Sequence, residues 1–402
     1  MLEALDEREP FRKNPNKIIE AQGIDELTSY FDSFTDFERI LYGANANYRD
    51  HVFHIFRTWL LGVYVIISKN FQITLIDGSD GRWDDFGKIT QCEIMSMWAI
   101  ISFCHDLGYP LEKAQGIFKE TKKMLGQIVS EPQISTDLSF SRSQDPNNYQ
   151  IIDFISTKIS KNPDNPDSFW GKIQSKYRYK LNASLERCAH GAISALIIYR
   201  KLTYFKESDF NLNFNFPYTD HKDVRQFYIR REILRAIAYH TCPDIYNIQI
   251  STFPSLLFMC DEMQNWERKN FTDIYSNSSD VHYQLTIEKF SDKTYEYVEE
   301  ITYDSEDIPL ETIVSNVFTH QYCKYKNKFR DAQDSANRDY EIKHTVKIMG
   351  TQNTKEATIT MCIKRGDSTD SFCVESGISL IKKNIKSITN SIFSSEYTYT
   401  KQ

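Results

Sequence analysis

The chain has 402 residues, of which 41% are hydrophobic, 26% are charged and 14% are aromatic, and these shares exclude a disordered or low-complexity protein. Its formal net charge of -7 argues against nonspecific binding of duplex nucleic acid, which needs a broad basic face. The length exceeds that of a usual single domain, so we expect one large domain and a smaller one.

The cysteines and the N-terminus indicate the compartment. None of the eight cysteines forms a CxxC pair and several lie in apolar runs, so we interpret them as reduced thiols. The N-terminus is charged and lacks an apolar core, and no segment reaches the roughly 18 apolar residues of a membrane span. We therefore expect a cytoplasmic protein without a membrane partner, and the oligomeric state stays open, with a homo-oligomer among the alternatives.

The first half of the chain reads as helix. Apolar periodicity predicts helix from Ile24 to Lys69, with a break between Gly43 and Asn47. A second, almost wholly apolar stretch ends at His105 and predicts a buried helix whose end carries polar groups. Residues 111–180 are more polar, with one amphipathic piece, GIFKETKKMLGQIV, and we interpret them as an insertion beside a site.

Helical patterns continue to residue 270, and the pattern then changes. The later helical stretches are SLERCAHGAISALIIYRKL, DVRQFYIRREILRAIAYH and FPSLLFMCDEMQNWERKN. Alternating polar and apolar residues then predict the strands YQLTIEKF, YEYVEEITY, HTVKIMG and EATITMCIKRG, with helices near Leu310 to Tyr322 and Gly377 to Phe393. We expect a mainly α protein with an N-terminal helical extension (1–46), a helical core domain (47–270) and a smaller α+β domain (271–402).

Several apolar helices carry a metal-ligating side chain at a position that the core should bury. Burying an imidazole or a carboxylate without a partner costs a few kcal/mol, and a single such histidine is more often a hydrogen-bonded core residue than a ligand. A whole series instead predicts a metal centre. Its members are His54, His105, Asp106, His190, His240 and Asp261.

The adjacent pair His105-Asp106 is the most informative part of the series, because its imidazole and carboxylate could bind one ion while the carboxylate bridges to a second. The ordered series resembles the HD superfamily of metal-dependent phosphohydrolases over roughly Asn47 to Lys269. The matching segments are HIFRTWLLG, CHDLGYP, HGAISALIIYRK, AIAYHT and LLFMCDEMQNWER. The resemblance implies an HD-type all-helical core.

The resemblance also implies how the ligands divide. The minimal site of the superfamily corresponds to His54, His105, Asp106 and Asp261 on one metal. His190 and His240 match the positions that hold a second metal in dinuclear members. We then expect two divalent transition-metal ions (Mn, Fe, Ni, Co or Zn), about 3.5–4 Å apart, that activate a bridging hydroxide for in-line attack on phosphorus.

Other residues are candidates for catalysis or substrate binding. His51 precedes His54 by three residues and so shares its face in a helix, where it could protonate a leaving oxygen. Cyclic-nucleotide phosphodiesterases place a general-acid histidine four residues before the ligand, so the spacing here departs from theirs. Two other roles for His51 stay open: a structural role, or replacement of His54 as the ligand. Lys113, Gln264 and Arg268 could bind an anionic substrate, with surface or salt-bridging roles as the alternative for Lys113 and Arg268.

The sequence therefore predicts an HD-type phosphohydrolase in which Asp106 and His51 take part in catalysis. Its substrate would be a phosphomonoester or phosphodiester of a nucleotide or related small metabolite. Two alternatives use the same ligands: a di-iron oxygenase of the HD type, and a metal-containing regulatory or interaction module without catalysis. Cys104, Cys188, Cys242 and Cys260 lie near the proposed ligands, but buried packing is the more usual role of a free cysteine.

Overall fold

A computed structural model gives the fold as two compact units, mainly helical with a smaller α+β part. The first unit contains residues up to Val63, Ile73–Ile245 and Thr252–Phe258, and the second contains Tyr64–Gln72, Tyr246–Ser251 and the chain from Met259. The structure describes residues 23–44, 50–71, 73, 89–128, 147–161, 169–205, 221–246, 248–266, 281–304, 308, 310–329, 340–351, 356–364 and 371–376. The domain boundaries expected after residues 46 and 270 lie outside these ranges.

The helix break expected near Gly43 is confirmed, because α3 (Ile24–Ala44) ends there and α4 (Val52–Ser68) begins after it. The carboxylate of Asp50 accepts a hydrogen bond from the N–H of Phe53 in the first turn of α4 (2.8 Å), which satisfies one of the donors that a helix start leaves free. Helix α3 belongs with the first unit: the hydroxyl of Tyr30 donates to the carbonyl of Leu107 at 2.9 Å.

Helix α5 (Gln91–Cys104) is the buried helix that the apolar stretch predicts. It begins with a capping box, in which the Thr90 hydroxyl accepts from the N–H of Glu93 and the Glu93 carboxylate accepts from the N–H of Thr90. Glu93 is also paired with Arg225 at 2.6 Å. The helix ends at Cys104, directly before the His-Asp pair.

The segment interpreted as a polar insertion contains regular structure. Its elements are α6 (Tyr109–Leu125), α7 (Asn147–Ile155), the antiparallel strands β1 (Thr157–Lys161) and β2 (Phe169–Ile173), and the first half of α8 (Ser175–Glu186). The amphipathic piece in this segment falls mostly within α6.

The helix predicted across SLERCAHGAISALIIYRKL is interrupted near its start. Helix α8 ends at Glu186 and α9 (His190–Lys201) begins four residues later. Cys188 lies in the left-handed region (φ 55), its N–H donates to the carbonyl of Leu185, and the N–H of Ala189 donates to that of Ser184. This pattern ends helices in a Schellman turn, and it makes His190 the first residue of its helix.

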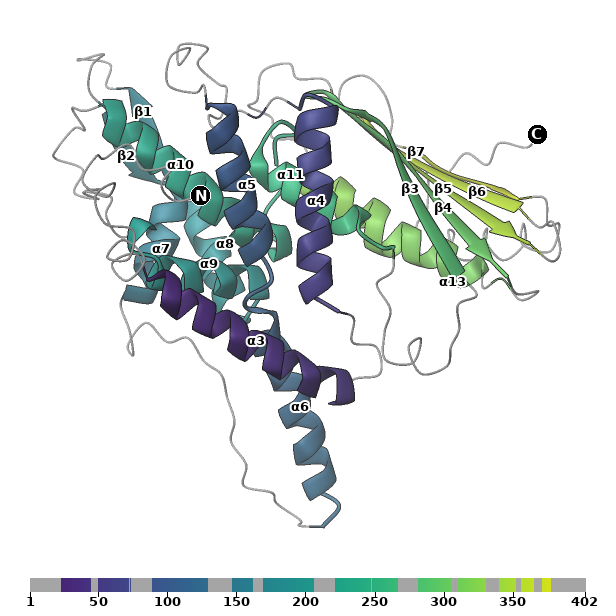
Figure 1. Cartoon of the computed structure of the whole chain (residues 1–402), viewed down its shortest axis with the longest axis horizontal. Coiled ribbons are helices and arrows are strands. Elements are labelled where there is room, and N and C mark those ends of the chain that lie inside the picture. Colours follow the sequence, from purple (N-terminus) through teal and green to yellow (C-terminus); the bar gives the residue numbers. More distant parts are fainter. Residues whose placement is uncertain are drawn as a thin grey trace. The chain divides into compact units, whose positions relative to one another are not determined.

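Two glycines let the remaining helices approach α9 closely. Helices α5, α9 and α10 (His221–Thr241) pack against one another (Figure 1). A β-carbon at Gly108 would collide with the backbone oxygen of His190, and the N–H of Gly108 donates to the hydroxyl of Ser194 at 2.8 Å. A β-carbon at Gly191 would meet the carbonyl of Ile237. Helix α11 (Phe253–Met263) contains the last residues of the first unit and continues into the second from Met259. It carries Pro254 in its first turn, where proline is tolerated.

The second unit contains a five-stranded sheet of order β3-β4-β5-β6-β7. The strands are β3 (Val281–Phe290), β4 (Thr294–Tyr303), β5 (Glu341–Gly350), β6 (Glu356–Lys364) and β7 (Ser371–Ser376). All pairings are antiparallel except that of β4 with β5. The four strands expected from alternation are confirmed, and β7 is an addition.

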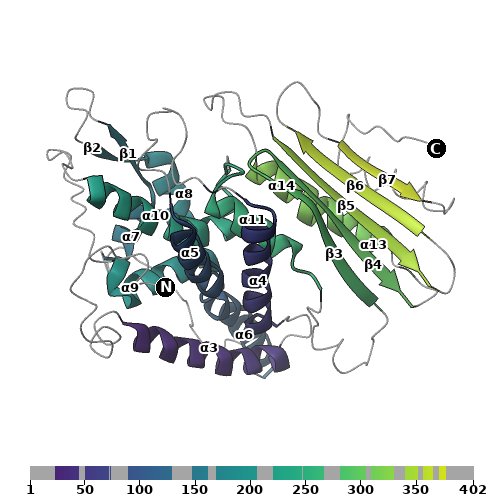
Figure 2. The same ribbon diagram turned by 45° about the horizontal axis from the view of Figure 1, so that its top comes forward.

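Helices lie on one face of this sheet and form the connection between β4 and β5 (Figure 2). They are α13 (Leu310–Asn316), a π-helical turn (Val317–Tyr322) and α14 (Cys323–Lys328), which confirms the helix expected near Leu310. The helix expected near Gly377 lies outside the described residues. In the part of the chain that the structure describes, no helix is long and apolar enough to cross a membrane.

Candidate metal centre

The first five expected ligands come from four places in the helical unit. His54 lies in α4, the pair His105-Asp106 follows the end of α5, His190 begins α9, and His240 lies in the last turn of α10. The side chains of His54, His105 and His240 are at most 1% exposed, that of Asp106 is 5% exposed and that of His190 is 17% exposed. The fold therefore brings polar groups from distant parts of the sequence into one buried cluster.

The carboxylate of Asp106 lies in the middle of this cluster, and its two oxygens face different histidines. Oδ2 lies 3.4 Å from Nε2 of His105 and 3.8 Å from Nε2 of His54. Oδ1 lies 3.3 Å from Nε2 of His190 and 3.7 Å from Nε2 of His240. A carboxylate arranged in this way could bridge two ions, each held by a different pair of imidazoles.

Hydrogen bonds to the other ring nitrogens decide which nitrogen each histidine offers. Nδ1 of His105 lies 2.7 Å from the carbonyl oxygen of Ser102, and Nδ1 of His240 lies 2.6 Å from that of Ile237. A carbonyl only accepts, so both Nδ1 atoms carry the proton, and in their neutral form the two rings present the Nε2 lone pair to Asp106. Lone pairs directed at a carboxylate repel it unless a cation lies between them, which favours a metal.

The histidines in their protonated form shift the pKa values of the neighbouring carboxylates. Burial alone would raise the pKa of Asp106, but the charge of His105 and the hydrogen bonds of His190 and His240 hold it well below its usual range. Burial would lower the pKa of His190, yet Asp106 and Glu112 raise it to about 9. Burial would likewise raise the pKa of Glu112, which its contacts with His190 and Lys113 lower to about 2.

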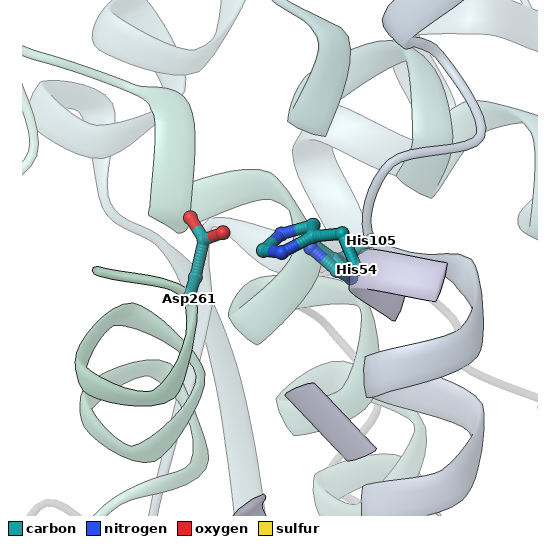
Figure 3. A group of neighbouring side chains, drawn as sticks. All are labelled: His54, His105 and Asp261. Atoms are coloured by element: carbon teal, nitrogen blue, oxygen red, sulfur yellow. The ribbon is translucent and has the colours of Figure 1, made fainter. Parts of the chain in front are cut away.

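Asp261, the last residue of the expected series, lies on α11. Figure 3 draws its carboxylate with the rings of His54 and His105, and one ligand atom from each of the three lies within 4.8 Å of the others. A second group with the same spacing consists of His105, Asp106 and His240. Both groups consist of histidines and aspartates.

The donor set fits a divalent transition metal. Imidazole and carboxylate together suit Mn, Fe, Co, Ni or Zn, whereas an oxygen-only shell would suit calcium. The hydrogen-bonded Nδ1 atoms also fit, because histidine ligands of metals almost always donate their second ring N–H to a carbonyl or carboxylate.

His51 directly precedes α4, which begins at Val52, and its ring lies beside that of His54, with the centroids 6.1 Å apart. The backbone N–H of His51 donates to Glu38 at 2.6 Å, and its Nδ1 lies 3.8 Å from the same oxygen. Its ring stacks on Tyr109, with the centroids 3.8 Å apart. Nε2 of His54 lies 3.8 Å from the carboxylate of Asp106.

Two of the three expected substrate-binding residues, Lys113 and Gln264, lie within the described residues. Nζ of Lys113 lies 3.0 Å from Glu112 and 4.7 Å from the ring centroid of Tyr109. Gln264 was expected on the face of Asp261, but α11 ends at Met263; Gln264 is fully buried and its side-chain amide donates to the carbonyl of Trp266. Arg268 lies outside the described residues.

Three residues beside the centre were missed by the sequence interpretation. Glu112 contacts His190, Tyr109 lies between the rings of His51 and His190, and Glu38 holds His51. Tyr109 and Glu112 are one helical turn apart, so their spacing with the His-Asp pair could have identified them. Glu38 gives no such signal, because α3 carries none of the expected ligands.

Comparison with family models, with curated proteins and with solved structures finds no match to this chain. The inference of function therefore depends on the residues of the centre and their geometry.

Proposed function

We propose that the chain is a metal-dependent phosphohydrolase with a dinuclear, HD-type centre. The observation that carries the proposal is the division of the Asp106 carboxylate, whose Oδ2 faces His54 and His105 and whose Oδ1 faces His190 and His240. All five residues belong to the helical unit. One ion would lie with each pair of histidines, and Asp261 would complete the shell of the ion held by His54 and His105.

Hydrolysis of a phosphoester suits this donor set. Two bound divalent ions would polarise a water molecule enough to supply a nucleophile near neutral pH, and would stabilise charge on the attacked phosphate. The chain's own residues would hold the ions in place. His105 and His240 are fixed by carbonyls of their own helices, so their Nε2 atoms keep one orientation. The cation of Lys113 lies against Tyr109, whose ring contacts that of His190, and could attract an anionic substrate.

The substrate proposed is a phosphomonoester or phosphodiester of a nucleotide or a related small metabolite. The proposed setting is the cytoplasm, where the eight free cysteines stay reduced. His51 would act through its neighbours, because its ring lies against Glu38 and Tyr109.

The test begins with the metal content of the purified full-length protein. Metal-free protein is then reloaded with manganese, cobalt or nickel under strictly anaerobic conditions, and phosphate release is measured with a panel of nucleotides and generic phosphoesters. We expect two equivalents of metal and phosphate release without oxygen consumption. Activity that needs both iron and oxygen, and is lost with manganese, would identify an oxygenase. Protein that binds no divalent ion would refute the proposal.

A further inference from the structure

Glu112 contacts His190 in two places at once. Its Oε2 accepts a hydrogen bond from the backbone N–H of His190 at 3.0 Å and lies 2.7 Å from Nδ1 of the same residue. Its Oε1 lies 3.0 Å from Nζ of Lys113. On the ring, Glu112 contacts Nδ1, whereas Nε2 faces Asp106. Glu112 would therefore act on the centre through His190.

The position of His190 in its helix explains why another helix supplies this acceptor. His105 and His240 each use the carbonyl three residues earlier, in the preceding turn of helix. His190 is the first residue of α9, and three residues earlier lies Arg187, beyond the end of α8. No turn of α9 precedes His190, so a carbonyl of its own helix cannot hold its Nδ1.

The same position leaves the backbone of His190 in need of an acceptor. The first N–H groups of a helix have no partner within it, and Ala189, the residue before α9, provides no side-chain cap. Glu112 supplies that acceptor from α6. One carboxylate oxygen thus fixes both the start of the helix and the orientation of the imidazole that the helix carries.

The charge of Glu112 distinguishes His190 from His105 and His240. The Nδ1 atoms of His105 and His240 donate to neutral carbonyls, whereas Nδ1 of His190 meets a carboxylate. A carboxylate behind a histidine ligand orients the ring and makes it a more basic ligand than a carbonyl does, and loss of such a partner typically weakens metal binding by about 10- to 100-fold.

We propose that Glu112 is the positioning residue for the ion held by His190 and His240, and that it sets the affinity of that ion without affecting the ion held by His54 and His105. This inference rests on the proposed dinuclear centre. Of the histidines whose Nδ1 contact is known, His190 is then supported by a carboxylate, whereas His105 and His240 are supported by carbonyls of the chain.

The experiment is a calorimetric titration of metal-free, full-length protein with manganese. Wild type should bind two equivalents. Glu112→Ala should weaken one equivalent by about 10- to 100-fold and leave the other unchanged. Glu112→Gln keeps an oxygen that accepts both hydrogen bonds but loses the charge, so its affinity should fall between those of wild type and Glu112→Ala. His240→Ala should affect the same equivalent, which identifies it.

Glu93→Gln is the matched control. Glu93 is also a buried carboxylate that accepts from the start of a helix and pairs with a basic side chain, so its loss should reduce stability without changing either metal affinity. If Glu112→Ala does not fold, as judged by circular dichroism, Glu112→Gln decides the question. Wild-type affinity at both equivalents in Glu112→Gln and Glu112→Ala, or equal weakening of both, overturns this inference alone. A wild-type protein that binds no manganese, cobalt or nickel overturns the dinuclear proposal itself.

Discussion

A β-carbon at Gly191 would lie 2.9 Å from Cε1 of His240, because α9 and α10 approach here with no side chain between them. The N–H of Gly191 also donates to the hydroxyl of Thr241 at 3.0 Å. This contact fixes the start of α9, with His190, against the end of α10, with His240. The distance between two of the four histidines thus depends on a residue that binds nothing itself.

Gly191→Ala should therefore separate the two helices. We expect a loss of about 1–3 kcal/mol in the free energy of unfolding, as for overpacked cores, together with weaker binding of the ion held by His190 and His240. Urea unfolding and metal titration would measure the two effects. Gly126→Ala is the control, since a β-carbon there meets only carbonyls of its own helix at 3.4 Å. Unchanged stability and metal affinity in Gly191→Ala would contradict the packing.

Asp106→Asn should reduce the metal content from two equivalents to one or fewer. An amide has one oxygen, so it cannot offer an acceptor to both pairs of histidines, and it lacks the negative charge that offsets two cations. Elemental analysis of the folded variant would measure the stoichiometry. Two equivalents of tightly bound metal in this variant would show that Asp106 does not bridge.

Glu93 should make stability depend on pH in the acid range. Burial would raise its pKa, but hydrogen bonds from Thr90 and Arg225 lower it below 4.5. A group whose folded pKa is depressed stabilises the protein above its unfolded pKa and loses this contribution as the pH falls through the folded value. Glu93→Gln should therefore cost about 1 kcal/mol near pH 7, measured by urea unfolding, and progressively less below pH 4.5. A difference that does not change with pH would contradict this.

The cysteines should react with alkylating reagents according to their burial. Cys92 is exposed, whereas Cys104, Cys188, Cys242 and Cys260 are buried, and burial raises the pKa of Cys104 to about 12. A thiol with such a pKa has almost no thiolate near pH 8. Mass spectrometry after brief treatment with iodoacetamide should find Cys92 modified and the other four modified only in denaturant. Rapid modification of Cys104 in the native protein would indicate a different environment.

Tyr30→Phe should destabilise the helical unit by about 1 kcal/mol, the usual value of one hydrogen bond. The hydroxyl of Tyr30 fastens α3 to the carbonyl of Leu107, directly after the His-Asp pair. Urea unfolding would measure the effect. An unchanged free energy of unfolding in Tyr30→Phe would indicate that this hydrogen bond from α3 does not stabilise the turn that carries Asp106.

The sequence predicts the helices that have a strong apolar pattern, because one buried face is sufficient to define them. The break after α8 escapes prediction because Cys188, and not the usual glycine, takes the left-handed conformation. The expected ligands can be picked out from the sequence, because each is a polar residue within or next to an apolar helical stretch. The spacing of Glu112 from the His-Asp pair places it near the centre, but its contact with His190 spans 78 residues and does not follow from the sequence. The position of Gln264 depends on where α11 ends, which periodicity defines poorly.

The parallel pairing of β4 with β5 has a consequence for folding. Strands β3 and β4 are joined directly, as are β5, β6 and β7, so each set can form from local contacts. Parallel strands need a long crossover, which here contains α13 and α14, and non-local pairing is slow because loop closure comes first. We expect the sheet to assemble as two local halves, with formation of the β4–β5 pair as its last and slowest step.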